Sequence, residues 1–361
     1  MRKPKVTREF TEEISTLISS STRLRPIAAI AIGLTALGIA ACNGTNSAVS
    51  NAGALPATVR IPHRASKPLP TPYQWSFSTV NDPNSVTFNR VMAVDDLNEI
   101  CGYYGTGTAS DPANGFTALW PYTRFRRLNY PGAVDTFPMS MSNSRILAGY
   151  FVDNTYGAHT WGFIRNRGIW TQYKDRREPN RRGSVTELLG INHNTISAGF
   201  YKDSYGQNEP FEFADNRFHP LNPPGFISAI ATAINLRGII VGTETLSSGT
   251  KQGWLLDSQT YYEFAYQNAI KTQVYGIDYD QQVVGSYIDS QGVTHGFVLT
   301  YPTSPTKKYW QSVDEPNAVG TTVITSMNNH HSISGWYVDS NGNTNGFVGI
   351  LANTKERRRI P

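Results

Sequence analysis

Short apolar runs separated by polar, glycine-rich turns recur along the chain from Val91 onward. In each run a glycine follows a mostly apolar pair and precedes aromatic residues, and a further aromatic residue follows about 12 positions later. Runs of this length between turn residues are typical of β-strands, so the pattern predicts one β unit repeated six times. The glycines, 43 to 50 residues apart, are Gly102, Gly149, Gly199, Gly242, Gly285 and Gly335, and the later aromatic residues are Phe116, Phe163, Phe211, Trp254, Phe297 and Phe347.

A small polar residue stands seven positions before each glycine, directly after an apolar residue: Asp95, Ser142, Asn192, Asn235, Asp278 and Asn328. Side chains of this kind can cap a turn by bonding to the nearby backbone. Each unit has room for four strands, of which the first ends at this turn, the second contains the glycine and the third contains the Gly-Phe pair. The fourth is aromatic and ends near an Asp/Asn-x-Pro turn. This is the size of a propeller blade.

The two ends of the repeat region complement each other. The last unit stops soon after Phe347 without a fourth strand, whereas the segment 77–84 before the first unit parallels 310–317 in the fifth unit, position by position. We expect this N-terminal strand to complete the last blade, which would remove exposed sheet edges. A linear β-solenoid would need no such permutation. The predicted fold is therefore all-β: a six-bladed β-propeller of four-stranded blades over residues 73–361.

With these motifs in place, residues 77–351 resemble bacterial extracellular HAF-type repeat proteins. The fifth unit carries the motifs most completely, in Val283-Val284-Gly285, Asp289, Gly292 and His295-Gly296-Phe297. Departures occur, because the fourth unit lacks the Asp and the Pro, and the third has Pro210 where glycine is usual. The resemblance implies an exported, propeller-like domain, and it implies no established chemistry.

The first 41 residues have the pattern of an export signal. Basic residues within 1–25 precede a mainly apolar stretch, 26–41, which is short for a membrane span and suits the apolar region of a signal peptide. The stretch ends in Ile39-Ala40-Ala41-Cys42, which resembles a bacterial lipobox. We expect 1–41 to be a lipoprotein signal peptide and Cys42 to be the lipidation site. The alternative is an ordinary signal peptide with an incidental cysteine.

Residues 42–72 are rich in Asn, Ser, Ala, Thr, Gly and Pro and are expected to form a flexible tether. The protein would then be exported and lipid-anchored to the bacterial cell envelope, at the outer membrane or the cell surface. The whole chain has 32 Lys+Arg and 27 Asp+Glu. Six of these basic and three of these acidic residues lie in the signal, so the remainder is close to neutral. A nucleic-acid partner is therefore not expected.

The candidate chemistry mostly follows the repeat. Asp153, Asp203, Asp289 and Asp339 each lie four residues after a unit glycine, where hairpin turns are the expected structure and calcium binding is the alternative. No other metal or cofactor is expected, because the histidines are scattered over different turns and strands. Ser248 and Lys251 have the spacing of a nucleophile and its base but fall in a loop. Cys101 is expected to be a buried residue without a disulfide partner.

A basic connection in the second unit is the main departure from the repeat. The stretch 174–183 holds five basic and two acidic residues. Arginine side chains bind carboxylates and phosphates through two parallel hydrogen bonds, so Arg176, Arg177, Arg181 and Arg182 are candidate ligand-binding residues. The alternative is a solvated insertion without a partner.

Two classes of function fit the sequence. The first is a surface binding or scaffold module for an anionic glycan or a protein partner. The second is a hydrolase or lyase that acts on polysaccharide from a propeller scaffold. A propeller enzyme would gather catalytic carboxylates by breaking the repeat, whereas the acidic residues here recur with it. The binding module is therefore favoured over the enzyme.

The predicted anchor can be tested by replacing Cys42 with alanine. Several acyl chains, at about 0.8 kcal/mol per buried methylene, would hold the protein on a membrane. We therefore expect Cys42→Ala to move the protein into the soluble fraction, as measured by cell fractionation and immunoblotting. Unchanged membrane partitioning would contradict lipidation at Cys42.

Overall fold

The computed structural model describes residues 72–108, 111–155, 158–179, 183–300, 302–304 and 307–352. Within these ranges the chain forms 24 β-strands and no helix, which confirms the all-β prediction. A helix able to span a membrane is accordingly not found in this part of the chain. The predicted signal peptide, Cys42 and the tether up to residue 71 lie outside the described residues.

The strands form antiparallel sets of four that follow chain order, and the first strand, β1, joins the last set. The first three sets are β2 (Phe88–Val94), β3 (Ile100–Gly105), β4 (Asn114–Ala118), β5 (Phe125–Arg127); β6 (Asp135–Met141), β7 (Leu147–Val152), β8 (Thr160–Asn166), β9 (Ile169–Tyr173); and β10 (Thr186–Ile191), β11 (Ser197–Lys202), β12 (Asn208–Ala214), β13 (Arg217–Pro220). The others are β14 (Phe226–Ile234), β15 (Ile240–Leu246), β16 (Lys251–Asp257), β17 (Thr260–Phe264); β18 (Lys271–Ile277), β19 (Val283–Ile288), β20 (Thr294–Thr300), β21 (Tyr309–Val313); and β22 (Thr322–Met327), β23 (Ile333–Val338), β24 (Thr344–Leu351), β1 (Trp75–Thr79).

Strand β1 pairs antiparallel with β24, from Trp75 opposite Leu351 to Thr79 opposite Phe347. The pairing continues at both ends, where the Val80 N–H donates to the Gly346 carbonyl and the Ala352 N–H donates to the Gln74 carbonyl, each at 2.8 Å. The Phe77 ring also packs edge-on against the ring of Phe347. The N-terminal segment thus supplies the strand that the last unit lacks, as predicted.

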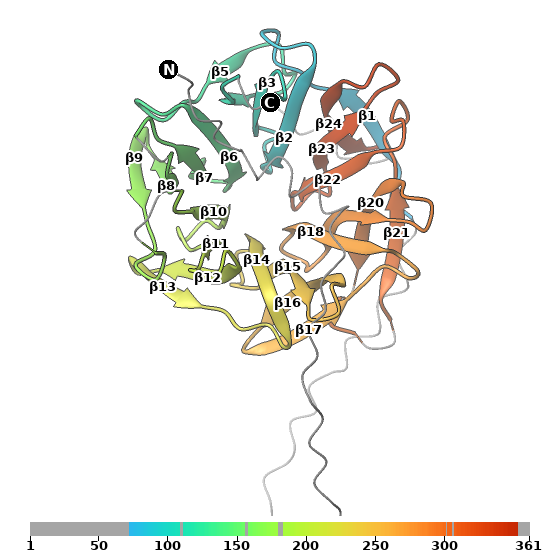
Figure 1. The fold of residues 1–361 in the computed structure, drawn as a ribbon. Helices are drawn as coiled ribbons and strands as arrows, with labels where there is room; N and C mark the ends of the chain where they lie inside the picture. The colour runs from blue at the N-terminus through green and yellow to red at the C-terminus, as the bar shows by residue number, and fades with distance from the viewer. Residues whose placement is uncertain are drawn as a thin grey trace, which may run out of the picture. The chain divides into compact units, whose positions relative to one another are not determined.

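In Figure 1 the sets of four succeed one another around a common centre, and the first strand of each repeat unit is innermost. Each innermost strand contains a β-bulge two to three residues before its turn residue. The residue after the bulge is always small: Ala93, Ser140, Gly190, Ala233, Gly276 and Ser326. A Cβ atom on Gly190 would lie 2.6 Å from the Cα atom of Ala233. Small residues therefore let neighbouring innermost strands approach closely.

The six repeat glycines lie close to the backbone of the innermost strand and to an aromatic ring of their own sheet. Each lies opposite the repeat aromatic residue of the third strand, as Gly285 lies opposite Phe297, and all six aromatic side chains are fully buried. A Cβ atom on Gly285 would lie 2.0 Å from the Gln273 carbonyl oxygen and 2.8 Å from the Phe297 ring. The glycines thus make room for an aromatic ring within their own sheet, and the close backbone approach at the centre depends on the small residues after the bulges.

The hydrophobic core lies between neighbouring sheets. One cluster joins Ile164 of the second unit to Leu188 and Phe211 of the third, and another joins Val284 of the fifth unit to Ile324 of the sixth. Cys101 is fully buried in such a cluster beside Met141 and carries a free thiol. Its predicted place in the core is therefore confirmed. Burial raises the pKa of this thiol well above its ordinary value, so it is not a nucleophile at neutral pH.

Deleting residues 73–86 would remove β1 and leave the outer edge of β24 without its partner. We expect the truncated protein to aggregate or to lose its single cooperative unfolding transition, because an open sheet edge pairs readily with other chains. Thermal unfolding followed by circular dichroism, together with size-exclusion chromatography, measures both effects. A deletion of equal length within 43–57, a part of the predicted tether, is the control and should change neither. A monomeric truncation as stable as the parent would contradict this role of β1.

Candidate functional site

The turns that follow the innermost strands are capped by the polar residues that repeat in the sequence. The Oδ1 atom of Asn235 accepts hydrogen bonds from the Arg237 and Ile239 N–H groups, both at 3.0 Å. Asn192, Asn328 and Asp95 accept the same pair of bonds in their own turns, and Asp278 and Ser142 accept one from the residue four positions on. The predicted capping role is confirmed.

The asparagines also use their amide nitrogen, which the sequence analysis did not anticipate. Nδ2 of Asn192 donates to the Asn235 carbonyl at 3.1 Å, and Nδ2 of Asn235 donates to the Asp278 carbonyl at 2.9 Å. Nδ2 of Asn328, in the last unit, donates to the carbonyl of Asp95, in the first unit, at 2.8 Å. One side chain thus caps its own turn and binds the turn of the neighbouring unit.

Aspartate and serine have no side-chain amide group. Where one of them is the turn residue, other residues make the contact between neighbouring units. The Asp96 N–H donates to Asn143 Oδ1 at 3.0 Å, and the Tyr279 N–H donates to Asn329 Oδ1 at 3.0 Å. Between the second and third units, Ser144 Oγ lies 2.8 Å from His193 Nδ1. Every junction between neighbouring units, including the last with the first, therefore carries a polar contact at these turns.

These turns surround a cavity to which all six units contribute. Its wall contains one residue from the bulge of each innermost strand: Met92, Met139, Leu189, Thr232, Tyr275 and Thr325. Its rim contains the residue directly after each turn residue: Asp96, Asn143, His193, Leu236, Tyr279 and Asn329. We call this space the central cavity. Its wall mixes apolar side chains with the hydroxyl-bearing Thr232, Tyr275 and Thr325, and most of its rim residues are polar. Small-molecule sites likewise combine apolar surface with a few polar groups.

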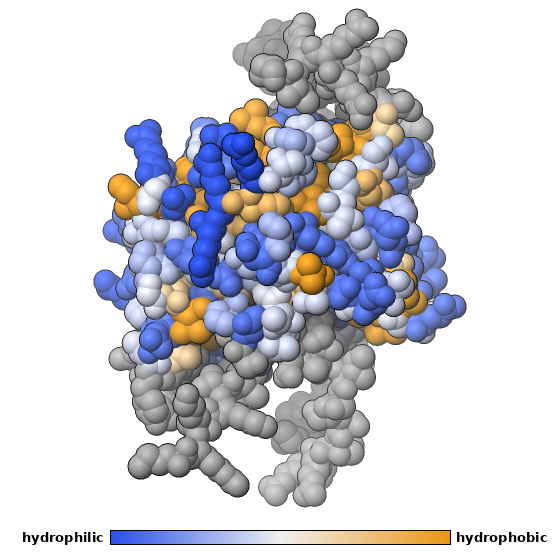
Figure 2. All heavy atoms as spheres, turned by 90° about the horizontal axis from the view of Figure 1, so that it is seen from above, coloured by the Kyte–Doolittle hydropathy of each residue, from blue (hydrophilic) through white to orange (hydrophobic). Residues whose placement is uncertain are grey.

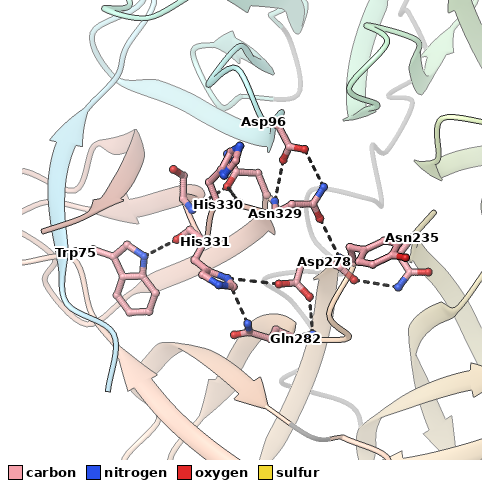
Figure 3. A network of polar contacts seen from close by, with 11 residues as sticks. Trp75, Asp96, Asn235, Asp278, Gln282, Asn329, His330 and His331 are labelled. Carbon is pink, nitrogen blue, oxygen red and sulfur yellow. Dashed lines mark hydrogen bonds and ion pairs between the residues drawn. The ribbon is translucent and has the colours of Figure 1, made fainter. Parts of the chain in front are cut away.

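Figure 3 shows the part of the rim that the fifth, sixth and first units share. Asn329 donates to both carboxylate oxygens of Asp96, from its N–H group and from Nδ2, each at 2.8 Å. Below it, His331 Nδ1 lies 3.6 Å from Asp278 Oδ2 and 3.2 Å from Gln282 Nε2. Burial raises the pKa of Asp278, while His331 and the Gln282 N–H oppose the rise. Trp75 Nε1 donates to the His331 carbonyl, so β1 also braces this part of the rim.

The rim residues were missed from the sequence, although a signal for them is present. The turn residues are uniformly small and polar, whereas the next position holds Asp, Asn, His, Leu, Tyr and Asn in the six units. The rim position varies between units because it does not have to cap the turn, as the turn residue before it does. Tyr279 and Leu236 are about half exposed there, at 48% and 50%.

The basic connection of the second unit lies away from this cavity, between β9 and β10. Arg177 Nε donates to Asp175 Oδ1 at 3.0 Å, and its guanidinium lies over the ring of Tyr201. Lys174 Nζ lies 2.9 Å from Glu178 Oε1. Arg176 is exposed, and Arg181 and Arg182 lie outside the described residues. Two of the basic side chains are thus engaged with acidic residues of the same loop.

The four repeat aspartates cap hairpin turns between the second and third strands. Asp289 Oδ1, for example, accepts hydrogen bonds from the Gln291 and Val293 N–H groups, each at 2.9 Å. Asp153, Asp203 and Asp339 accept the equivalent bonds. In the described part of the chain, no three His, Cys, Asp or Glu side chains come together in a way that could hold a metal ion. The hairpin interpretation therefore accounts for these residues.

His295 is the most strongly paired of the histidines in this hairpin region. Its Nδ1 lies 2.9 Å from Asp314 Oδ2, and its Nε2 lies 3.4 Å from Asp289 Oδ2. Partial burial alone would lower the pKa of His295, but the hydrogen bonds and charges of Asp314 and Asp289 outweigh it and raise the pKa. When protonated, the imidazolium of His295 forms ion pairs that link the hairpin to the loop after the fourth strand.

On the side seen in Figure 2, the described residues show no large continuous hydrophobic patch. Hydrophilic residues cover most of this side, and hydrophobic residues appear singly or in small groups among them. Scattered apolar residues are normal on protein surfaces. The central cavity is therefore the candidate site that the geometry favours.

Comparison with known proteins does not assign a family, because no family model and no curated protein matches the chain. Among solved structures, the chain is similar to a protein of unknown function from Dyadobacter fermentans, with 9% identity, a TM-score of 0.52 and coverage of 76% of this chain and 98% of that one. A six-bladed propeller lectin from Aleuria aurantia matches with 9% identity, a TM-score of 0.43 and coverage of 80% and 100%. A Trypanosoma rangeli sialidase matches with 7% identity, a TM-score of 0.45 and coverage of 76% and 57%. The first likeness concerns the fold alone, and the other two are too distant to support a conclusion.

The ion pairs of His295 predict a specific pH dependence. A histidine whose pKa is raised on folding adds stability below its unfolded pKa of about 6.5, and this contribution disappears as the pH rises through the folded value. We therefore expect His295→Asn to lower the thermal unfolding temperature at a pH of about 5.5 and to change it much less at about 8.5. His219, exposed on β13, provides the control variant His219→Asn. An equal effect of His295→Asn at both pH values would contradict the pairing.

Proposed function

We propose that this protein is an exported, lipid-anchored binding module, a closed six-bladed β-propeller whose central cavity binds a glycan. The observation that carries the proposal is the cavity itself, which has a polar rim and a wall supplied by every one of the six repeat units. The HAF-type resemblance, the lipid anchor at Cys42 and the location at the bacterial envelope belong to the same proposal.

Four contacts between the two ends of the repeat support closure of the propeller. Strand β1 pairs with β24 of the last unit, and Asn328 of that unit donates to the carbonyl of Asp95 in the first. The innermost strand of the first unit, β2, meets β24 at Phe88 opposite Thr344. A hydrophobic cluster also joins Val91 and Ile100 of the first unit to Val348 of the last. Together these contacts link the last unit to the first with hydrogen bonds and apolar packing.

The chemistry of the rim supports a sugar as the ligand. The side chains of Asp96, Asn143 and Asn329 bond to one another, and their remaining lone pairs and amide hydrogens can form the hydrogen bonds that sugar hydroxyls require. The exposed ring of Tyr279 offers an apolar face with a polar tip, which suits stacking on a sugar ring. Met92 and Met139 in the wall provide adaptable apolar surface.

A hydrolase or lyase is the less favoured alternative. The two carboxylates at the cavity, Asp96 and Asp278, both have structural hydrogen bonds: Asp96 accepts from Asn329, and Asp278 accepts from the Gln282 N–H at 2.7 Å. Carboxylates held in this way stabilise turns, whereas a catalytic pair must exchange protons with substrate. A protein partner on the rim remains a further outcome of the binding test.

The proposal is tested by removing the exposed side chains of the rim. Full-length protein in detergent is passed over immobilised dextran, chitin fragments and alginate, and retention is measured for the parent and for Tyr279→Ser. Loss of the stacking ring should weaken retention by about tenfold on the glycan that the parent binds. Tyr205, 87% exposed on the hairpin between β11 and β12, provides the control variant Tyr205→Ser, which should bind like the parent. Parent protein that none of these columns retains, or equal retention of all three proteins, would contradict glycan binding at the rim.

The basic connection is tested on the same columns. If Arg176, Arg177, Arg181 and Arg182 contact an anionic glycan, their joint replacement by serine should weaken retention on alginate and reduce its dependence on salt. Unaltered retention with unaltered salt dependence would assign the connection to the solvated insertion instead. This comparison separates an anionic contact at the loop from binding at the rim.

A further inference from the structure

Arg90 is a buried arginine on the innermost strand of the first unit, next to residues that line the central cavity. It lies on β2, two residues before Met92 of the cavity wall, and it is 8% exposed. Its guanidinium carbon lies 4.2 Å from the ring centre of Trp336 and 5.0 Å from that of Phe88. Its Nη1 donates to the Tyr103 hydroxyl at 3.2 Å. The side chain is thus held between two aromatic rings and one hydroxyl group.

The charge of Arg90 has no acidic counterpart in these contacts. Among the described residues, no carboxylate forms an ion pair with Arg90, and its Nε has no hydrogen-bond acceptor. Burying an unpaired ion is costly, and a cation over an aromatic face recovers only part of that cost. The protein therefore bears a cost at this position that its own contacts do not offset, and a bound anion would offset it.

The residue type at the position of Arg90 is not repeated in the other units, whereas the repeat glycines and the small residues after the bulges are. The equivalent residues of the other innermost strands are Phe137, Glu187, Ile230, Gln273 and Val323, and they share neither size nor charge. The glycines of the next strand and the small residues after the bulges are maintained in all six units. Only the first unit carries a positive charge at this position, and the third unit carries a negative one in Glu187. The repeat itself does not require the positive charge, so a role in binding explains it better.

Tyrosine hydroxyl groups lie around this arginine and remain protonated. Burial raises the pKa of Tyr275 to about 12, against the opposing effects of Ser286 and the positive charge of Arg90. Burial likewise raises the pKa of Tyr150, where Glu187 and Tyr103 add to the rise and Arg90 opposes it. No phenolate therefore neutralises Arg90 near pH 7. Tyr275 also lines the central cavity, so its side chain connects the cavity to the surroundings of Arg90.

We propose that Arg90 binds the anionic group of a ligand, a carboxylate, sulfate or phosphate, next to the residues that line the central cavity. The planar guanidinium presents paired N–H donors that match such oxyanions, and its Nε–H has no other acceptor. This inference rests on the proposed function and narrows it, because it makes the ligand an acidic glycan whose charged substituent reaches inward while its hydroxyl groups contact the rim.

The experiment titrates full-length protein in detergent with sodium sulfate, sodium phosphate and sodium glucuronate at constant ionic strength. Tryptophan fluorescence and the thermal unfolding temperature are measured for each anion. We expect a saturable change in both signals with the preferred anion, because Trp336 contacts the guanidinium. Arg90→Met, which keeps an apolar stem of similar length, should weaken the response at least about tenfold. Arg90→Lys keeps the charge without the planar donor pair and should bind more weakly than the parent.

Two further variants locate the response. Trp336→Phe should lose the fluorescence change and keep the rise in unfolding temperature, whereas Arg217→Met, which removes an exposed arginine on β13, should respond like the parent. The inference is overturned if no anion gives a saturable response, or if Arg90→Met responds like the parent. Tyr279→Ser should keep the anion response even where it loses glycan retention, so failure at the rim and failure at Arg90 are distinguishable.

Discussion

The fold depends on one side-chain arrangement at the turn after each innermost strand. The carbonyl oxygen of the asparagine amide caps its own turn, and the nitrogen of the same amide binds the backbone of the adjacent unit. Local turn geometry and the spacing between units are thereby fixed by a single residue. An aspartate side chain can cap its own turn but has no N–H group to donate to the adjacent unit. Next to Asp95 and Asp278, Asn143 and Asn329 of the adjacent turns therefore form the contact between units.

Two kinds of small residue then determine where space is filled and where it is left. The repeat glycines allow one large aromatic ring to be buried inside each sheet, as Gly335 does for Phe347. The small residues after the bulges bring the innermost strands together, and the bulged residues themselves line the central cavity. The cavity is therefore a product of the packing rules of the repeat, and its chemistry is set by positions that those rules leave free.

Much of the fold could be predicted from the sequence because its determinants repeat. Four-stranded units, the turn caps and the pairing of the N-terminal strand with the last unit all followed from columns of equivalent residues. The candidate site could not be predicted in the same way. Tyr279 and Arg90 occupy positions whose residue type differs between units. Their surroundings are formed by residues of other units, which the sequence alone does not bring together. The basic connection was conspicuous in sequence, yet Asp175 and Glu178 engage part of its charge.

The pairing of β1 with β24 also dictates an order of assembly. Every other strand has at least one pairing partner close to it in the chain and can pair with it as soon as that partner has been synthesised. Strand β1 is made first, but its partner is the last strand of the domain. It therefore stays unpaired until the rest of the domain has been synthesised. Bringing such distant segments together is slow compared with forming hairpins. The pairing of β1, the first strand of the domain, is consequently expected to be the last step in its folding.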